Sequence, residues 1–98
     1  MSDLIGKRVI VRDHMAGTYF ATLAAFDPVA KTATLTDARK LHQWYAAGPD
    51  GLAAKGTRYD RSRVCPAVAR VEVCSVVQVL ECTEAAAAQL SAAPVWEP

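Results

Sequence analysis

Long apolar runs are missing from this 98-residue sequence. No window approaches the roughly eighteen apolar residues that a membrane-crossing helix needs. The first residues, MSDLIGKRVIVRD, meet a charge every few positions, unlike the apolar stretch of a secretory signal. We therefore expect a protein without a signal peptide, a transmembrane helix or a membrane partner.

Paired cysteines and clustered histidines are also missing. Cys65, Cys74 and Cys82 have no Cys-x-x-Cys spacing, and His14 and His42 stand alone. Zinc sites need closely spaced ligand pairs, so we expect no metal and no other cofactor. The cysteines are expected to be reduced and buried as small apolar side chains.

Catalytic motifs are absent as well: there is no hydrolytic triad pattern, phosphate-binding loop or His-Glu-x-x-His. One catalytic alternative stays open, with Cys65 as nucleophile, His42 as base, and Arg61 and Arg63 favouring the thiolate. These residues are neighbours only in sequence, which does not establish their mutual geometry. We therefore favour a role that is not enzymatic.

Alanine is abundant, with nineteen copies, and the apolar composition is that of a single folded domain spanning residues 1–98. Because alanine fills little volume, larger side chains have to form the core. Those expected there are Leu4, Ile5, Val9, Val11, Phe20, Leu23, Phe26, Leu35, Val71, Val73, Val77, Val79, Leu80 and Leu90.

The first third of the sequence has the pattern of a three-stranded meander. Strands are expected at residues 5–13, 18–27 and 31–37, separated by short turns. In the third strand Ala33 and Leu35 alternate with threonines, which predicts one buried face and one threonine-lined face.

The pattern then changes to one typical of a basic insertion, residues 39–69. In ARKLHQWYAAG, Leu41, Trp44 and Tyr45 have the spacing of one helical face, and Gly48-Pro49 is expected to end that helix. A second short helical turn is expected in DGLAAKG, followed by an irregular loop.

Residues 70–82 return to a strand pattern whose period slips, which predicts a bulge or a break into two strands. Thr83 is a suitable N-cap for a C-terminal helix over 83–93, and Trp96 is expected to fold back onto the core. The predicted fold is mainly β (α+β). It is a small, strongly bent five-stranded sheet or SH3/Sm-like barrel, with a short helical insertion after strand 3 and a C-terminal helix.

Charge is unevenly distributed although the net charge is only +1. Residues 39–70 contain seven cations and two anions, or +5, whereas the rest of the chain contains four cations and eight anions, or −4. Such a split suggests an anionic partner or a head-to-tail contact between copies. The cations are interleaved with aromatic residues that suit phosphates and bases. The candidate ligand-binding residues are Arg39, Lys40, His42, Arg58, Tyr59, Arg61 and Arg63.

Two resemblances accompany these patterns. AGTYFATLAAFDPVAKTATLTDA resembles the first half of an Sm-like motif, although Ala21 stands where an interior glycine is usual and the later Arg-Gly signature is missing. The segments TLTDARKLHQWYAAG and VARVEVCSVVQVLECTEAAAAQLSAAPVWEP resemble a family of small tailed-phage and prophage proteins of unknown function. The second resemblance implies action in a host cytoplasm or in a virion, and it supplies no catalytic residues.

The sequence therefore favours a homo-oligomeric, non-enzymatic phage-type accessory protein. Its basic and aromatic surface would bind a nucleotide-like ligand or nucleic acid. A virion structural component that makes only protein contacts is the alternative, and a cysteine-dependent enzyme is a third hypothesis.

Overall fold

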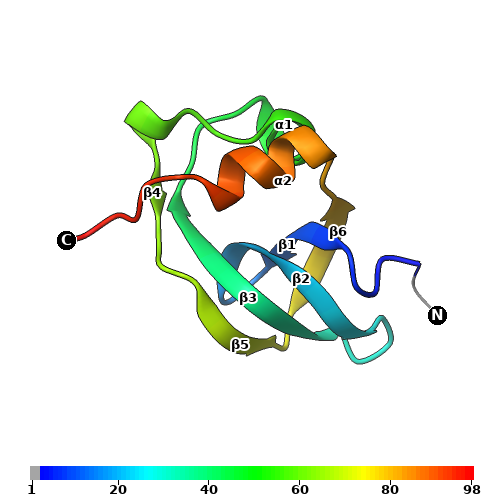
Figure 1. Cartoon of the computed structure of the whole chain (residues 1–98). Helices are drawn as coiled ribbons and strands as arrows, with labels where there is room; N and C mark the ends of the chain where they lie inside the picture. The colour runs from blue at the N-terminus through cyan, green and yellow to red at the C-terminus, as the bar shows by residue number, and fades with distance from the viewer. Residues whose placement is uncertain (1–2) are drawn as a thin grey trace.

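Six strands and two α-helices make up the domain in the computed structural model, which describes residues 3–98 (Figure 1). The elements are β1 (Arg8–Asp13), β2 (Gly17–Asp27), β3 (Thr32–Gln43), α1 (Gly48–Lys55), the 3-10 turn η1 (Tyr59–Arg61), β4 (Arg63–Val64), β5 (Val68–Val73), β6 (Val76–Glu81) and α2 (Glu84–Ser91). The mainly β class and the helical insertion after the third strand are confirmed. The strand beyond the expected five is β4, which has only two residues.

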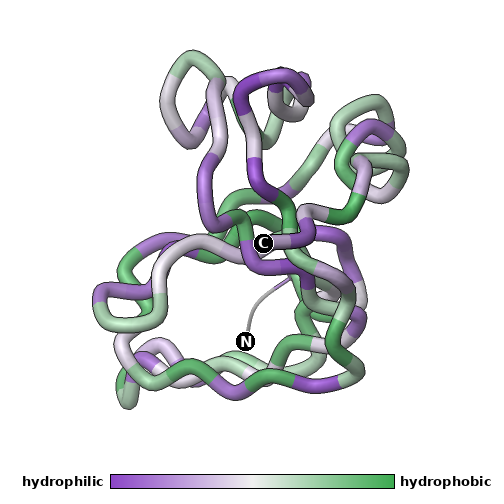
Figure 2. Tube along the Cα trace, turned by 90° about the vertical axis from the view of Figure 1, so that its left-hand side faces the viewer, coloured by the Kyte–Doolittle hydropathy of each residue, from purple (hydrophilic) through white to green (hydrophobic). Residues whose placement is uncertain are grey.

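The sheet is antiparallel and strongly bent. Its strands follow the order β4-β3-β2-β1-β6, and β5 also pairs with β3. Only Cys74 and Ser75 separate β5 at one edge from β6 at the other, so the two edges must come close together at this point. Figure 2 shows the trace curving round in this way. The expected break within residues 70–82 is confirmed.

The sheet buries apolar side chains on both of its faces. The inner face of the bend holds Val9, Val11, Leu23 and Leu35, together with side chains from both edge strands. The outer face holds a second cluster that joins the sheet to α1 and α2, and that cluster contains Ile10, Phe20, Leu41, Leu52, Val64 and Leu90. Consecutive residues of β1 thus belong to different cores, because neighbouring side chains of a strand point to opposite faces.

The prediction of which side chains form the core is partly wrong. Ile5 and Val77 are exposed at 43% and 61%, whereas Ile10 and Leu52, which the sequence pattern did not select, are fully buried. Cys74 is also exposed, because it lies in the short connection between β5 and β6 rather than within a strand.

The helix expected just after residue 37 does not form; β3 instead continues to Gln43. The helix-like spacing of Leu41, Trp44 and Tyr45 is misleading because it spans the end of β3: Leu41 belongs to the strand, whereas Trp44 and Tyr45 follow it. The register within β3 is also irregular. Thr36 pairs with Thr22 and Arg39 with Phe20, so β3 has one extra residue in a bulge at Asp37, whose φ is 46°. Gly48 and Pro49 begin α1 rather than end a helix, and proline suits a first helical turn.

The C-terminal segment follows the predicted course. The Thr83 side chain accepts a hydrogen bond from the Ala86 N–H and caps α2, which ends at Ser91. The chain then returns to β4, where the Trp96 N–H donates to the Val64 carbonyl at 2.8 Å. None of the helices within residues 3–98 has the length and apolar character needed to cross a membrane.

Candidate functional site

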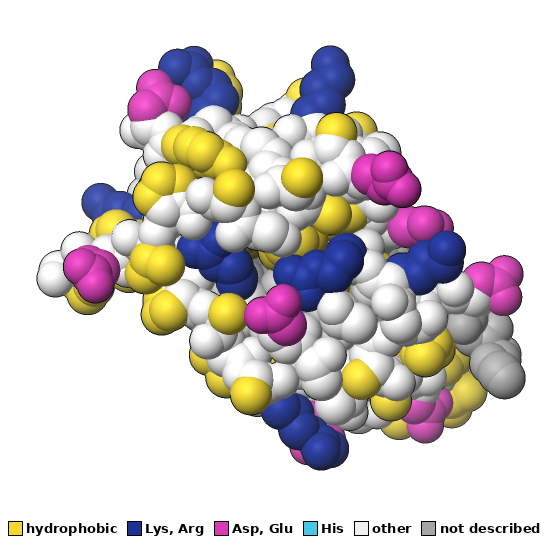
Figure 3. All heavy atoms as spheres, viewed as in Figure 1, with side chains coloured by type: hydrophobic (Ala, Val, Ile, Leu, Met, Phe, Trp, Pro, Cys, Tyr) yellow, Lys and Arg dark blue, Asp and Glu magenta, His cyan; other side chains and the backbone are white. Residues whose placement is uncertain are grey.

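The most concentrated group of cations and aromatic rings lies where the chain leaves β3. The guanidinium of Arg61 lies 4.6 Å from the ring centroid of Tyr45, and that of Arg58 lies 5.7 Å from it. Arg58 also forms a two-pronged ion pair with Asp60, with N···O distances of 2.8 and 3.2 Å. In Figure 3 basic side chains project at the top of the domain, over η1 and α1. All of these side chains are exposed, so the electrostatic attraction of the cations remains available to a partner.

The loop that presents these side chains is held firmly. The buried Thr57 hydroxyl accepts a hydrogen bond from the Tyr45 N–H at 2.8 Å and lies 2.7 Å from the Ser62 hydroxyl. The Thr57 N–H donates to Gln89 of α2 at 3.0 Å. Gly56 ends α1 with a φ of 85°, where an added Cβ would overlap the Gln89 side chain. The segment between α1 and η1 is therefore tied to α2.

A hollow of about 560 Å³ opens beside Tyr45, and we call it the Tyr45 hollow. Small residues of α1 and its flanks form much of its wall, while Lys55 and Arg58 provide the charges. An aromatic wall beside cationic groups suits a ligand that has a flat ring and a negative group. Its lining residues are Tyr45, Ala46, Ala47, Gly51, Lys55, Gly56, Thr57 and Arg58.

A second group of rings and cations lies at the end of β3. The His42 and Trp96 rings are stacked, with centroids 5.1 Å apart and planes 3° apart. The Arg63 guanidinium lies 5.3 Å from the Trp96 ring centroid. Because β3 and β4 pair through Gln43 and Arg63, this group adjoins the loop that carries Arg61.

Of the other predicted site residues, Tyr59 lies in η1, next to Arg58, whereas Lys40 and Arg39 lie apart from these two groups. Tyr59 is 41% exposed, and its hydroxyl donates to the Gln89 carbonyl of α2. Lys40 lies beside Gly17 at the start of β2, on the sheet face opposite to that of its neighbour Arg39. Of the seven predicted residues, the structure thus places Arg58, Tyr59, Arg61, Arg63 and His42 on one side of the domain.

Arg39 is 5% exposed and lies beneath the C-terminal end of α2. Its Nη1 donates to the carbonyls of Leu90 and Ala93 at 2.8 and 2.9 Å, and its Nε donates to the carbonyl of Cys65 at 2.9 Å. Burial lowers the pKa of Arg39, but an arginine still remains charged at neutral pH. Its position therefore makes it a cap for the carbonyls that end α2.

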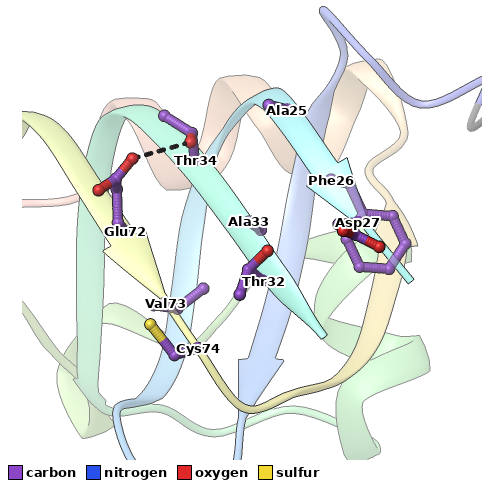
Figure 4. A pocket seen from close by; sticks show the side chains of 9 residues that line it. All are labelled: Ala25, Phe26, Asp27, Thr32, Ala33, Thr34, Glu72, Val73 and Cys74. Carbon is purple, nitrogen blue, oxygen red and sulfur yellow. Dashed lines mark hydrogen bonds between the residues drawn. The ribbon is translucent and has the colours of Figure 1, made fainter. Parts of the chain in front are cut away.

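The opposite end of the domain carries two carboxylates, one of which, Glu72, forms an ion pair with Arg70 at 3.0 Å. A hollow of about 290 Å³ lies between the ends of β2, β3 and β5, and Figure 4 shows its lining residues. The Thr34 hydroxyl donates there to the Glu72 carboxylate at 3.2 Å, and Asp27 supplies a second carboxylate. No Lys or Arg belongs to this lining in the described chain.

Sequence reasoning missed Tyr45, Trp96 and Lys55 as parts of the surface. It placed Tyr45 and Trp96 in the core, yet Tyr45 is 48% exposed and Trp96 is only partly buried. The only available signal was the cluster of cations at Lys55, Arg58 and Arg61, which follows Tyr45 at a distance of ten or more residues; no cation lies near Trp96 in the sequence. What sequence could not supply was the turn that brings residue 45 back to residue 58.

Within residues 3–98, no group of three or more His, Cys, Asp or Glu side chains is placed to hold a metal ion. The Cys65 N–H donates to the Lys40 carbonyl, while His42 stacks on Trp96. Burial raises the pKa of Cys82 to about 11, so that its thiol stays protonated at neutral pH.

The fold and this surface define a small mainly β domain, with a bent antiparallel sheet, two covering helices and one basic, aromatic side. Residues 6–90 match the model of a domain of unknown function, DUF6948. The chain belongs to that family. No curated protein and no solved structure matches it.

Proposed function

We propose that this chain is a non-enzymatic, homo-oligomeric accessory protein of phage type that binds a nucleotide-like ligand or nucleic acid. The observation that supports this best is the exposed Tyr45 ring, whose centroid lies within 6 Å of the guanidinium groups of Arg58 and Arg61; Arg58 also lines the Tyr45 hollow, whereas Arg61 lies outside its lining. A base would stack on the ring, and a phosphate would pair with the arginines. The resemblance of residues 34–98 to phage and prophage proteins supports a role in a host cytoplasm or in a virion.

The different charges of the two ends support self-association. The carboxylates of Asp27 and Glu72 lie at one end, where Arg70 pairs with Glu72, and Arg58 and Arg61 lie at the other, so the Asp27 carboxylate of one copy suits the basic end of the next. The same observation favours the alternative function, a virion component that makes only protein contacts. Such a component would assemble without affinity for nucleotides or nucleic acid.

A double substitution, Arg58→Ala with Arg61→Ala, tests the proposed surface. Binding of a fluorescent single-stranded oligonucleotide and of a fluorescent nucleotide would be followed by anisotropy at fixed salt. We expect affinity to fall on the order of tenfold or more, because two charge-assisted contacts are lost. The matched control is Lys7→Ala with Arg12→Ala, which removes the same charge from exposed positions of another surface.

Equal affinity in the two double variants would refute the proposed surface. Assembly of the wild type without affinity for either probe would favour the structural alternative. Slow alkylation of Cys65 at neutral pH would end the hypothesis of a cysteine enzyme, and the protonated Cys82 thiol is the internal reference.

A further inference from the structure

A third hollow lies on the outer face of the sheet, among the start of β1, the bulge of β3 and the C-terminal end of α2. It has a volume of about 250 Å³, and Arg8, Asp37, Arg39 and Ser91 are among its lining residues. In Figure 3 two basic groups flank an acidic one in a depression near the centre of the view. Two guanidinium groups against one carboxylate leave this hollow with a net positive charge.

The buried guanidinium of Arg39 is incompletely satisfied. Nε and Nη1 donate to carbonyl oxygens, but Nη2 is inaccessible to solvent and has no hydrogen-bond partner within the described chain. No carboxylate within residues 3–98 forms an ion pair with Arg39. An unpartnered donor on a buried cation is costly, since neither water nor an opposite charge compensates for its lost hydration.

Arg8 holds a second guanidinium beside the same hollow. It lies 4.1 Å from the Phe20 ring centroid, and its Nη1 donates to the Thr22 hydroxyl at 2.9 Å. The same nitrogen lies 3.4 Å from Oδ2 of Asp37, whose side chain is 69% exposed. The Asp37 carboxylate is therefore an exposed and weakly bound counter-charge for a cation that is itself well positioned.

We propose that this hollow binds a small oxyanion, a carboxylate or a phosphate group, whose oxygens accept hydrogen bonds from Arg8 and from Nη2 of Arg39. The ligand replaces Asp37 beside Arg8, and it also has to displace the part of the wall that separates Nη2 of Arg39 from the hollow. The bound anion supplies the opposite charge that the buried arginine lacks. This site is separate from the Tyr45 hollow and does not depend on the proposed function.

Nuclear magnetic resonance of the arginine side chains tests the site directly. Sodium phosphate, and separately sodium acetate, would be titrated at constant ionic strength while the Nε–Hε signals of Arg8 and Arg39 are followed. We expect saturable shifts of both signals with at least one probe. Saturation by phosphate alone would assign the site to phosphate groups, and saturation by acetate alone to carboxylates. Linear drift or no shift with both probes would overturn the proposal.

Substitutions sharpen the test. Asp37→Asn removes the competing carboxylate but keeps a residue that tolerates positive φ, so affinity should rise about fivefold, a change that unfolding cannot imitate. Arg8→Gln should lower affinity about tenfold, whereas Lys7→Gln, an exposed neighbour, should leave it unchanged. Unchanged affinity in Asp37→Asn would contradict the displacement of Asp37. Arg58→Ala with Arg61→Ala should bind as the wild type does, which separates this site from the Tyr45 hollow.

Discussion

The arginines of this domain occupy two contrasting environments, one buried and one exposed. Arg39 is buried under α2, and backbone carbonyls accept its hydrogen bonds. Arg58 and Arg61 are exposed around Tyr45, with one carboxylate and one ring as partners. The first environment makes the guanidinium part of the fold, while the second leaves it available to a partner in solution.

The course of the backbone decides whether an arginine of this chain is buried or exposed. The bulge at Asp37 shifts the phase of β3 and directs Arg39 to the outer face, opposite Phe20, where α2 covers it. Past Gln43 the chain leaves the sheet, and although α2 covers Thr57, the side chains of Arg58 and Arg61 are exposed. We therefore expect changes at buried polar groups to affect stability and changes at the exposed arginines to affect binding.

The largest loss of stability is expected for Arg39→Met. It leaves the carbonyls of Leu90, Ala93 and Cys65 without their donor, and the free energy of unfolding should fall by about 3 kcal/mol. Urea denaturation measures this, with Arg63→Met as the exposed counterpart, for which we expect less than about 0.5 kcal/mol. Similar losses in the two variants would remove the distinction between the two environments.

Asp13 is a second buried polar group that serves the backbone. Its carboxylate accepts hydrogen bonds from the N–H groups of Met15, Ala16 and Ser75 at 3.0, 2.8 and 2.8 Å, which ties the β1–β2 turn to the break between β5 and β6. Asp13→Asn should lower the free energy of unfolding by about 2 kcal/mol at neutral pH. The substitution replaces one carboxylate oxygen by an NH₂ group, which then faces a backbone N–H that has lost its acceptor.

The same carboxylate predicts a dependence on pH. Burial alone raises the pKa of Asp13, but the hydrogen bonds from Ala16, Ser75 and Met15 outweigh it and leave the pKa below its ordinary value. A depressed folded-state pKa stabilises the protein above the unfolded value of 3.8, and that contribution is lost as pH falls through the lower folded value. Denaturation measured between neutral pH and acid should show this loss in the wild type and a smaller one in Asp13→Asn. Parallel curves for the two proteins would contradict this account.

A smaller effect is expected at Thr83, which is exposed but bonded to two helices. Its hydroxyl accepts from the Ala86 N–H at 3.0 Å and donates to the Ala54 carbonyl of α1 at 2.7 Å. Thr83→Ala should lower the free energy of unfolding by about 1 kcal/mol, and Thr83→Ser should recover most of that loss. Differential scanning calorimetry of the three proteins measures this difference. If the serine variant is no more stable than the alanine variant, the Thr83 hydroxyl is not the source of the stabilisation.

The smallest change in stability is expected for Arg58→Ala with Arg61→Ala. Both side chains are exposed, and exposed ion pairs contribute little, so we expect a change below about 1 kcal/mol. Denaturation and ligand binding should be measured on the same preparation. A loss as large as that of Arg39→Met would make these arginines structural and would weaken the proposed function.

Much of the fold followed from local patterns. The meander, the break near Ser75 and the cap at Thr83 depend on alternation, period and a single hydroxyl, all of which are visible in the sequence. The error at residues 38–47 had a physical cause. Leu41 lies in the last part of β3, whereas Trp44 and Tyr45 lie just beyond the strand, so an i, i+3, i+4 spacing across a strand end imitates one face of a helix.

The candidate site was only partly predictable, because it depends on contacts between distant parts of the chain. Arg58, Arg61 and Arg63 were selected by charge, and they do lie close to rings. The burial of Arg39 depends on the phase of β3 and on a helix some fifty residues later in the chain. Composition contains no information on such long-range pairing.

Light scattering of protein purified from cells, on a gel-filtration column with absorbance read at 260 and 280 nm, tests self-assembly and the anionic ligand in one experiment. The account predicts a defined oligomer of the wild type with excess absorbance at 260 nm, and loss of that excess in Arg58→Ala with Arg61→Ala but not in Lys7→Ala with Arg12→Ala. The extracted species would then be identified by mass. A monomer without excess absorbance would contradict both the assembly and the anionic ligand.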